Sequence, residues 1–161
     1  MAAETAGLEF EREFEFSPAI VFDALIDPGL IAGWLGDASV DPRQGGHYDL
    51  VWLTSSSFPP TFGTITGILE PYSLTIATDN RGEIGFRLEE VPGGARGTST
   101  KLHLTVRVVV DAAFIARVRA DWLSNLDQLS ELLRGHPVDW ANWDRDRAEV
   151  WRGYLRLTAE H

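Results

Sequence analysis

Cysteine is absent from the chain, so it can form no disulfide and offers no thiol nucleophile or thiolate metal ligand. Basic residues are few: 14 Lys and Arg stand against 24 Asp and Glu, which gives a formal net charge of −10. This excess of negative charge repels nucleic acid and anionic lipid, so neither is an expected partner. Charged residues interrupt the most hydrophobic stretch, 102–118, which is therefore no membrane span. We expect no membrane insertion.

Chemical motifs are scarce as well. The first ten residues lack the basic patch and apolar core of a signal peptide, which favours a cytoplasmic protein. The histidines show no spacing typical of metal ligands, and they are His47, His103, His136 and His161. No serine lies in a nucleophile-elbow motif, and no glycine-rich phosphate loop precedes a helix. The sequence thus predicts no metal site, no cofactor and no catalytic residue.

The 161 residues instead contain a run of strand-like segments followed by one long amphipathic helix. Residues 8–16 alternate between apolar and mostly acidic side chains, as in a strand with one buried and one solvated face. Further strands are predicted at 47–53, 62–69, 74–78, 84–88 and 100–110. Because the connections between these strands are short, we expect an antiparallel meander.

Helix signals surround these strands. Ser17-Pro18 and Asp27-Pro28 each combine an N-cap with a first-turn proline, which predicts two short helices, the second ending at Gly36. Asp111 and Gly135 bound the long helix as N-cap and C-terminal glycine. We expect a single domain at 1–135 and a C-terminal helical extension at 136–161, with its helix at about 143–157.

Six features of the sequence occur in an order that is typical of one superfamily. They are Ser17-Pro18 with Val21-Phe22 and Ala24-Leu25 up to Asp27-Pro28; Leu30-Ile31 with Trp34-Leu35; Gly45-Gly46; Gly63 with Glu70-Pro71; Gly97-Thr98; and Trp122, Leu126 and Leu129. Together they resemble the START-like helix-grip (SRPBCC) superfamily. The nearest branch is named after the C-terminal domain of the heat-shock-protein-90 ATPase activator. The resemblance covers residues 8–135.

This resemblance implies an α+β helix-grip fold, as in START domains and the birch-pollen allergen. Such a fold has a seven-stranded antiparallel sheet curved around a long C-terminal helix, with two short helices closing one end. A ligand-binding cavity between sheet and helix is implied as well. The extension lies outside the usual pattern, so it could cover a pocket mouth or contact a second subunit.

The candidate lining of this cavity consists of inward-facing side chains. For any one of them, core packing is the simpler interpretation, whereas as a group they are expected to border a cavity for a hydrophobic ligand. We expect the Tyr48 hydroxyl to orient the ligand and Trp34 to lie near the entrance or pack on the sheet rim. The predicted ligand-binding residues are Arg12, Trp34, Tyr48, Leu50, Trp52, Phe86, Leu104, Trp122, Leu126 and Leu129.

Arg12 interrupts the apolar face of the first strand. An inward arginine needs a carboxylate, a backbone carbonyl or a ligand anion, because an unpaired buried charge is costly. It could therefore hold an acidic head group of a ligand. Alternatively, the side chain extends to solvent, or a bulge turns it outward.

Large aromatic residues gather near the end of the chain. Trp140, Trp143, Trp151 and Tyr154 could form a homodimer patch, or they could fold back onto their own domain.

Three functions are compatible with these features. The first is a carrier or sensor that binds an apolar or amphipathic small molecule in the cavity. The second is an enzyme of the cyclase, hydrolase or lyase type, which would need two or more convergent titratable groups in the cavity. The third is a stress-related chaperone-interacting protein, which the branch name alone suggests. The sequence favours the first.

Overall fold

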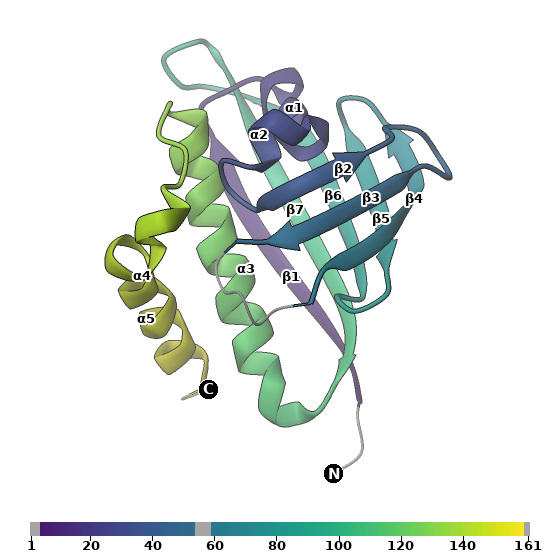
Figure 1. The fold of residues 1–161 in the computed structure, drawn as a ribbon. Coiled ribbons are helices and arrows are strands. Elements are labelled where there is room, and N and C mark those ends of the chain that lie inside the picture. The colour runs from purple at the N-terminus through teal and green to yellow at the C-terminus, as the bar shows by residue number, and fades with distance from the viewer. Residues whose placement is uncertain (1–3, 54–58, 160–161) are drawn as a thin grey trace.

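Seven antiparallel strands form one curved sheet in the computed structural model, which describes residues 4–53 and 59–159 (Figure 1). The strand order across the sheet is β1-β7-β6-β5-β4-β3-β2. The strands are β1 (Glu4–Phe14), β2 (Gly36–Val40), β3 (His47–Trp52), β4 (Thr61–Leu69), β5 (Ser73–Thr78), β6 (Glu83–Pro92) and β7 (Thr98–Val110). Except for the β1–β7 pair, neighbouring strands are consecutive in sequence, as in the predicted meander.

Helices pack on the concave side of this sheet. The short helices α1 (Pro18–Ile26) and α2 (Pro28–Ile31) close one end, and the long helix α3 (Ala112–Leu133) lies along the sheet. After α3 come the 3-10 helix η1 (Trp140–Asn142), α4 (Trp143–Asp146) and α5 (Ala148–Ala159). This arrangement confirms the predicted α+β helix-grip fold.

The boundaries of α3 follow from its flanking residues. Asp111 has the extended backbone of an N-cap, and Gly135 has φ +91°, a conformation that costs glycine little. Between them, Trp122, Leu126 and Leu129 are buried against the sheet. Each such buried side chain contributes roughly 1.5–3 kcal/mol through removal of apolar surface from water. The observed helix, Ala112–Leu133, confirms the predicted limits to within one residue.

Three elements differ from the expectation. Residues 36–40 form the edge strand β2, whereas the sequence suggested only the end of a helix there, because the segment GDASV is short and polar. The C-terminal helix predicted at 143–157 is divided at Arg147 into α4 and α5. The first strand is also displaced toward the N-terminus and ends at Phe14.

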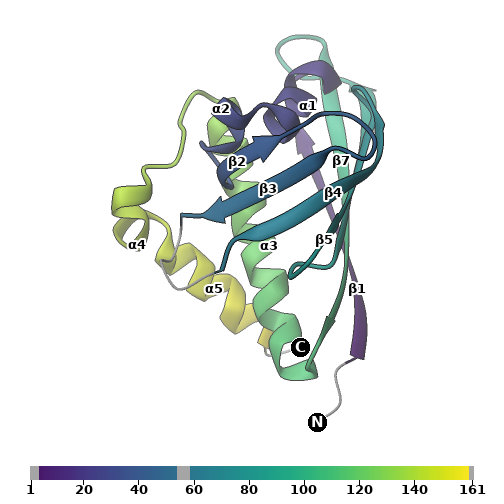
Figure 2. The same cartoon turned by 45° about the vertical axis from the view of Figure 1, so that its right-hand side comes forward.

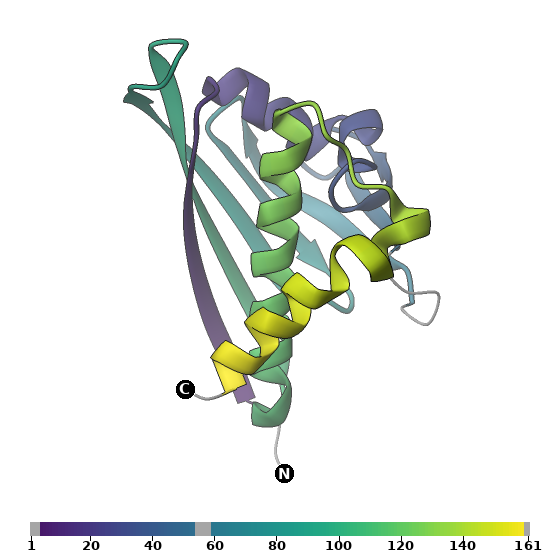
Figure 3. The ribbon, with the colours of Figure 1, turned by 90° about the vertical axis from the view of Figure 1, so that its left-hand side faces the viewer.

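The extension folds back onto its own domain. In two views of the ribbon, α3 lies between the sheet and α5 (Figures 1 and 2), and α5 crosses α3 obliquely (Figure 3). Trp143 and Trp151 donate hydrogen bonds to Gln128 and Asp121 of α3. The aromatic residues of the extension therefore pack against this chain.

Candidate ligand pocket

A pocket of about 780 Å³ opens between the sheet, the N-terminal half of α3 and the extension. This volume lies within the range of roughly 300–1,000 Å³ that is typical of small-molecule sites. Its lining comprises Trp52, Leu53, Asn80, Arg81, Val108, Val110, Phe114, Arg117, Val118, Asp121, Trp122, Ser124, Asn125, Trp140, Trp143, Asp144, Ala148, Trp151 and Arg152. The pocket thus has three walls, and the extension provides one of them.

Tryptophan is concentrated in the lining of the pocket. Five of the six tryptophans of the chain line it: Trp52, Trp122, Trp140, Trp143 and Trp151. Four of their indole nitrogens donate hydrogen bonds, at 2.6–2.8 Å, to Thr61 Oγ1, the Ala32 carbonyl, Gln128 Oε1 and Asp121 Oδ1. Because these polar edges already have partners, the rings are held in place and can offer their apolar surfaces to a ligand.

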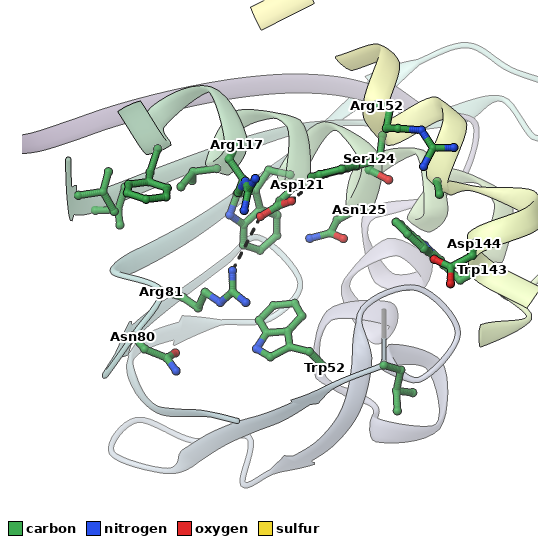
Figure 4. Close-up of a pocket in the computed structure, with 18 of the residues that line it drawn as sticks. Trp52, Asn80, Arg81, Arg117, Asp121, Ser124, Asn125, Trp143, Asp144 and Arg152 are labelled. Carbon is green, nitrogen blue, oxygen red and sulfur yellow. Dashed lines mark hydrogen bonds and ion pairs between the residues drawn. The ribbon is translucent and has the colours of Figure 1, made fainter. Parts of the chain in front are cut away.

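An arginine and a carboxylate face each other across the pocket (Figure 4). Arg81 Nη1 lies 3.9 Å from Asp121 Oδ2, and the Arg81 guanidinium lies 4.4 Å from the centroid of the Trp52 ring. Burial raises the pKa of Asp121, although the hydrogen bond from Trp151 and the charges of Arg81 and Arg117 act in the opposite direction. Burial also lowers the pKa of Arg81, against the effect of Asp121.

Two polar side chains on α3 have no partner within the described part of the chain. Ser124 is 3% exposed, and its buried Oγ makes no hydrogen bond. Asn125 is 9% exposed, and its carboxamide, which Figure 4 shows below α3 on the pocket side, is in no hydrogen bond among residues 4–53 and 59–159. Native proteins rarely leave buried polar groups unpaired, so these groups are suited to contact a ligand.

Only Trp52 and Trp122 of the predicted ligand-binding residues line this pocket. Trp34 is fully buried in the hydrophobic core and donates to the Ala24 carbonyl at 2.8 Å. The Tyr48 hydroxyl donates to the Leu25 carbonyl at 2.6 Å and is therefore used within the protein, and burial raises its pKa. The remaining apolar candidates are core residues: Leu50, Phe86, Leu104, Leu126 and Leu129.

Arg12 lies outside the pocket lining and has a protein carboxylate as its partner. Its Nη1 is 2.7 Å from Asp127 Oδ1, and Asp127 also accepts a hydrogen bond from the Tyr154 hydroxyl. Arg12 is thus paired with a carboxylate of the protein, which was one of the partners expected for an inward arginine. The three residues join β1, α3 and α5.

The charged and amide groups of the pocket escaped the sequence reasoning. A helical signal was available, because Asp121 is three residues from Val118 and Asn125 is three residues from Trp122, on the face that turns to the pocket. No comparable signal places Arg81, which lies in the turn between β5 and β6 and reaches the pocket through sheet pairing.

The histidines and the helices were the remaining candidates for a metal site and for a membrane span. His47 is exposed, and His103 lies on the outer face of the sheet between Glu11 and Glu89. Within residues 4–53 and 59–159, no three histidine or acidic side chains gather in a way that could hold a metal ion. No helix in the described part of the chain is long and apolar enough to cross a membrane.

Comparison with known proteins gives one family. The family model of activator of Hsp90 ATPase homolog 1-like proteins matches residues 15–134, which is most of the chain. No curated protein matches the sequence.

Several solved structures share the fold. CalU16 from Micromonospora echinospora has a TM-score of 0.62 at 21% identity, covering 96% of this chain and 99% of that protein. EF2215 from Enterococcus faecalis, a conserved protein of unknown function, has a TM-score of 0.66 at 17% identity, covering 97% and 86%. An AHSA1-like protein from Aeromonas hydrophila has a TM-score of 0.65 at 21% identity, covering 81% and 93%.

The solved structures differ in the share of this chain to which they align. The alignments with CalU16 and EF2215 cover more of the chain than residues 1–135 could supply, so they include part of the extension. The alignment with the Aeromonas hydrophila protein covers less. At these identities the likeness concerns the fold alone.

Proposed function

The chain belongs to the family of activator of Hsp90 ATPase homolog 1-like proteins, and from that premise we propose that it binds an apolar or amphipathic small molecule. The molecule occupies the pocket between sheet, α3 and extension, and the protein acts as its carrier or sensor. Helix-grip domains are a ligand-binding fold, which supports this function in general terms.

The observation that carries the proposal is the concentration of tryptophan around an open volume. Five indoles border about 780 Å³, whereas only Trp34 lies elsewhere, in the filled core. Aromatic side chains left around an unfilled space lose the dispersion contacts that a bound apolar molecule would restore. The unpartnered Ser124 and Asn125 add polar contacts for an amphipathic molecule.

Two neighbouring residues of β7 provide a matched test. Val110 lines the pocket, whereas Val109 faces the other side of the sheet and is 65% exposed. We expect the wild-type protein to bind the neutral dye Nile red with a rise in dye emission. Val110→Trp fills part of the pocket and should weaken binding by about tenfold, or about 1.4 kcal/mol.

Val109→Trp adds the same side chain on the opposite face and should leave the dye affinity unchanged. Trp122→Ala, which removes part of the lining, should alter it. Thermal unfolding of each variant checks that the protein is folded under the conditions of the titration. Equal affinities for the Val109 and Val110 variants would exclude the pocket as the binding site.

An enzyme that uses the same pocket is a second candidate, because Arg81, Arg117 and Asp121 converge there. A carboxyl group with a raised pKa beside arginine is suited to general acid–base chemistry. Native mass spectrometry of protein from its own host should identify a bound compound. A compound that is chemically unchanged after incubation with the protein supports carriage, whereas a changed mass supports catalysis.

A further inference from the structure

We propose that the pocket selects an aromatic organic acid, whose carboxylate lies near Arg117 and Asn125 and whose ring system contacts the tryptophans. This inference rests on the proposed function and names the chemical class of the ligand.

One arginine of the lining, Arg117, is in no ion pair among the described residues, and the second lining aspartate, Asp144, is exposed. Three arginines and two aspartates border the pocket, although the whole chain has a net charge of −10. Arg81 faces Asp121, and Arg152 at the exposed rim is paired with Glu149 at 3.1 Å. The Arg117 guanidinium has no hydrogen bond or ion pair with a residue of the described part of the chain, although its charge also acts on Asp121 one helical turn away. Its charge is therefore available to a bound carboxylate.

A cation is disfavoured for a physical reason. Indole rings beside a carboxylate are a known recognition site for ammonium groups. Here the protein itself supplies the cation, because the Arg81 guanidinium lies over the Trp52 ring and beside Asp121. A cationic ligand at this place would be repelled by both Arg81 and Arg117.

Two neutral hydrogen-bond donors lie on the same helix as Arg117 and border the same pocket. Ser124 Oγ and the Asn125 carboxamide can both donate hydrogen bonds, and neither has a partner among the described residues. Arg117, Ser124 and Asn125 all lie on α3 and all border the pocket. Asp121, on the same helix, already accepts from Trp151 and faces Arg81, so its negative charge is partly compensated.

The tryptophans determine the shape of the remaining part of the ligand. Trp140, Trp143 and Trp151 come from the extension, whereas Trp52 and Trp122 come from β3 and α3. Their indole rings border one volume from different sides, and a planar ring system presents large faces to such walls. The ligand class is thus a planar aromatic body with one carboxylate.

Three probes with the same ring test this inference: 1-naphthaleneacetic acid, 1-naphthaleneacetamide and 1-naphthalenemethylamine. At neutral pH they are anionic, neutral and cationic, and each displaces Nile red if it enters the pocket. We expect the acid to bind about tenfold more tightly than the amide, since a charge-assisted hydrogen bond contributes about this factor. The amine should bind most weakly.

Substitutions then locate the preference. Arg117→Gln should lower the affinity for the acid by about tenfold and leave that for the amide within about twofold. Arg107→Gln is the matched control, because Arg107 is an exposed arginine on the outer face of β7. Asn125→Asp, nearly equal in shape, should also weaken binding of the acid by placing a negative charge at the site.

The outcomes separate the two proposals. A preference for the acid over the amide that Arg117→Gln removes supports the inference. Equal binding of the three probes, tighter binding of the amine, or an acid preference that Arg117→Gln does not change overturns it and leaves the proposed function intact. Absence of Nile red binding overturns both.

Discussion

The two ends of the interface between sheet and helix α3 are built in contrasting ways. Near the C-terminal half of α3 the space is filled by Trp34, Tyr48, Leu126 and Leu129, all buried. Near the N-terminal half the space remains open as the pocket. We refer to these as the closed end and the open end.

Polar groups distinguish the ends as clearly as packing does. At the closed end, Trp34 and Tyr48 donate to the carbonyls of Ala24 and Leu25, and Gln128 Nε2 donates to the Trp34 carbonyl. These bonds join α1 and α2 to β3 and α3. At the open end, Ser124 Oγ and the Asn125 carboxamide lack partners among the described residues. The polar groups of the closed end are thus used within the fold, whereas those named at the open end have no such partners in the described part of the chain.

Replacing a tryptophan with alanine at each end should give the largest difference in unfolding free energy between the two ends. Trp34→Ala removes a fully buried indole and leaves the Ala24 carbonyl without its donor, so we expect a loss of about 4 kcal/mol in the free energy of unfolding. Trp140→Ala removes a half-buried indole at the open end and should cost roughly half as much. Urea denaturation measures both.

An exposed aromatic residue serves as the control for this pair. Phe62 is 57% exposed on β4, so Phe62→Ala should change the unfolding free energy by less than about 1 kcal/mol. Equal losses for Trp34→Ala and Trp140→Ala would remove the distinction between a filled and an open end.

The difference between the ends also shows what the sequence could predict. Strand alternation and helical spacing correctly identified the inward side of β1, β3, β7 and α3, because these patterns report which face of an element is buried. These patterns do not report whether the facing element fills the space next to that face or leaves a pocket there. Leu126 and Trp122 lie on one stripe of α3, yet only Trp122 borders the pocket.

The third wall and the edge strand required information beyond local pattern. The sequence showed that large aromatic residues gather in the extension, but the position of the extension over α3 depends on hydrogen bonds between residues distant in sequence, such as Trp151 with Asp121. The polar segment of β2 forms a strand because β3 pairs with it along its length. Tertiary pairing of this kind overrides weak local preference.

A smaller effect is expected where the extension is attached to the open end. Trp151→Phe retains a ring but removes the hydrogen bond of 2.7 Å to Asp121, leaving a carboxylate without its donor. We expect a loss of about 1.5 kcal/mol in urea denaturation and weaker Nile red binding. Val150→Ala, at a 40% exposed position one residue earlier, is the control. A variant as stable as the wild-type protein would show that this bond does not hold the wall in place.

Asp121→Asn should have the smallest effect and one that depends on pH. The variant keeps an oxygen to accept from Trp151 and removes the charge whose burial raises the pKa of Asp121 above its ordinary value of 3.8. Between these two pKa values, the folded protein binds more protons than the unfolded chain, so the wild-type unfolding free energy falls as the pH rises through this window. The variant lacks this decrease, and its stability relative to the wild-type protein should therefore increase from acid to neutral pH. Urea denaturation of both proteins across the window measures the change. If the difference in unfolding free energy between the two proteins did not change with pH, the folded protein would accommodate the Asp121 charge as well as water does. Asp121 would then behave like a carboxylate on an exposed surface groove, and not like a buried one.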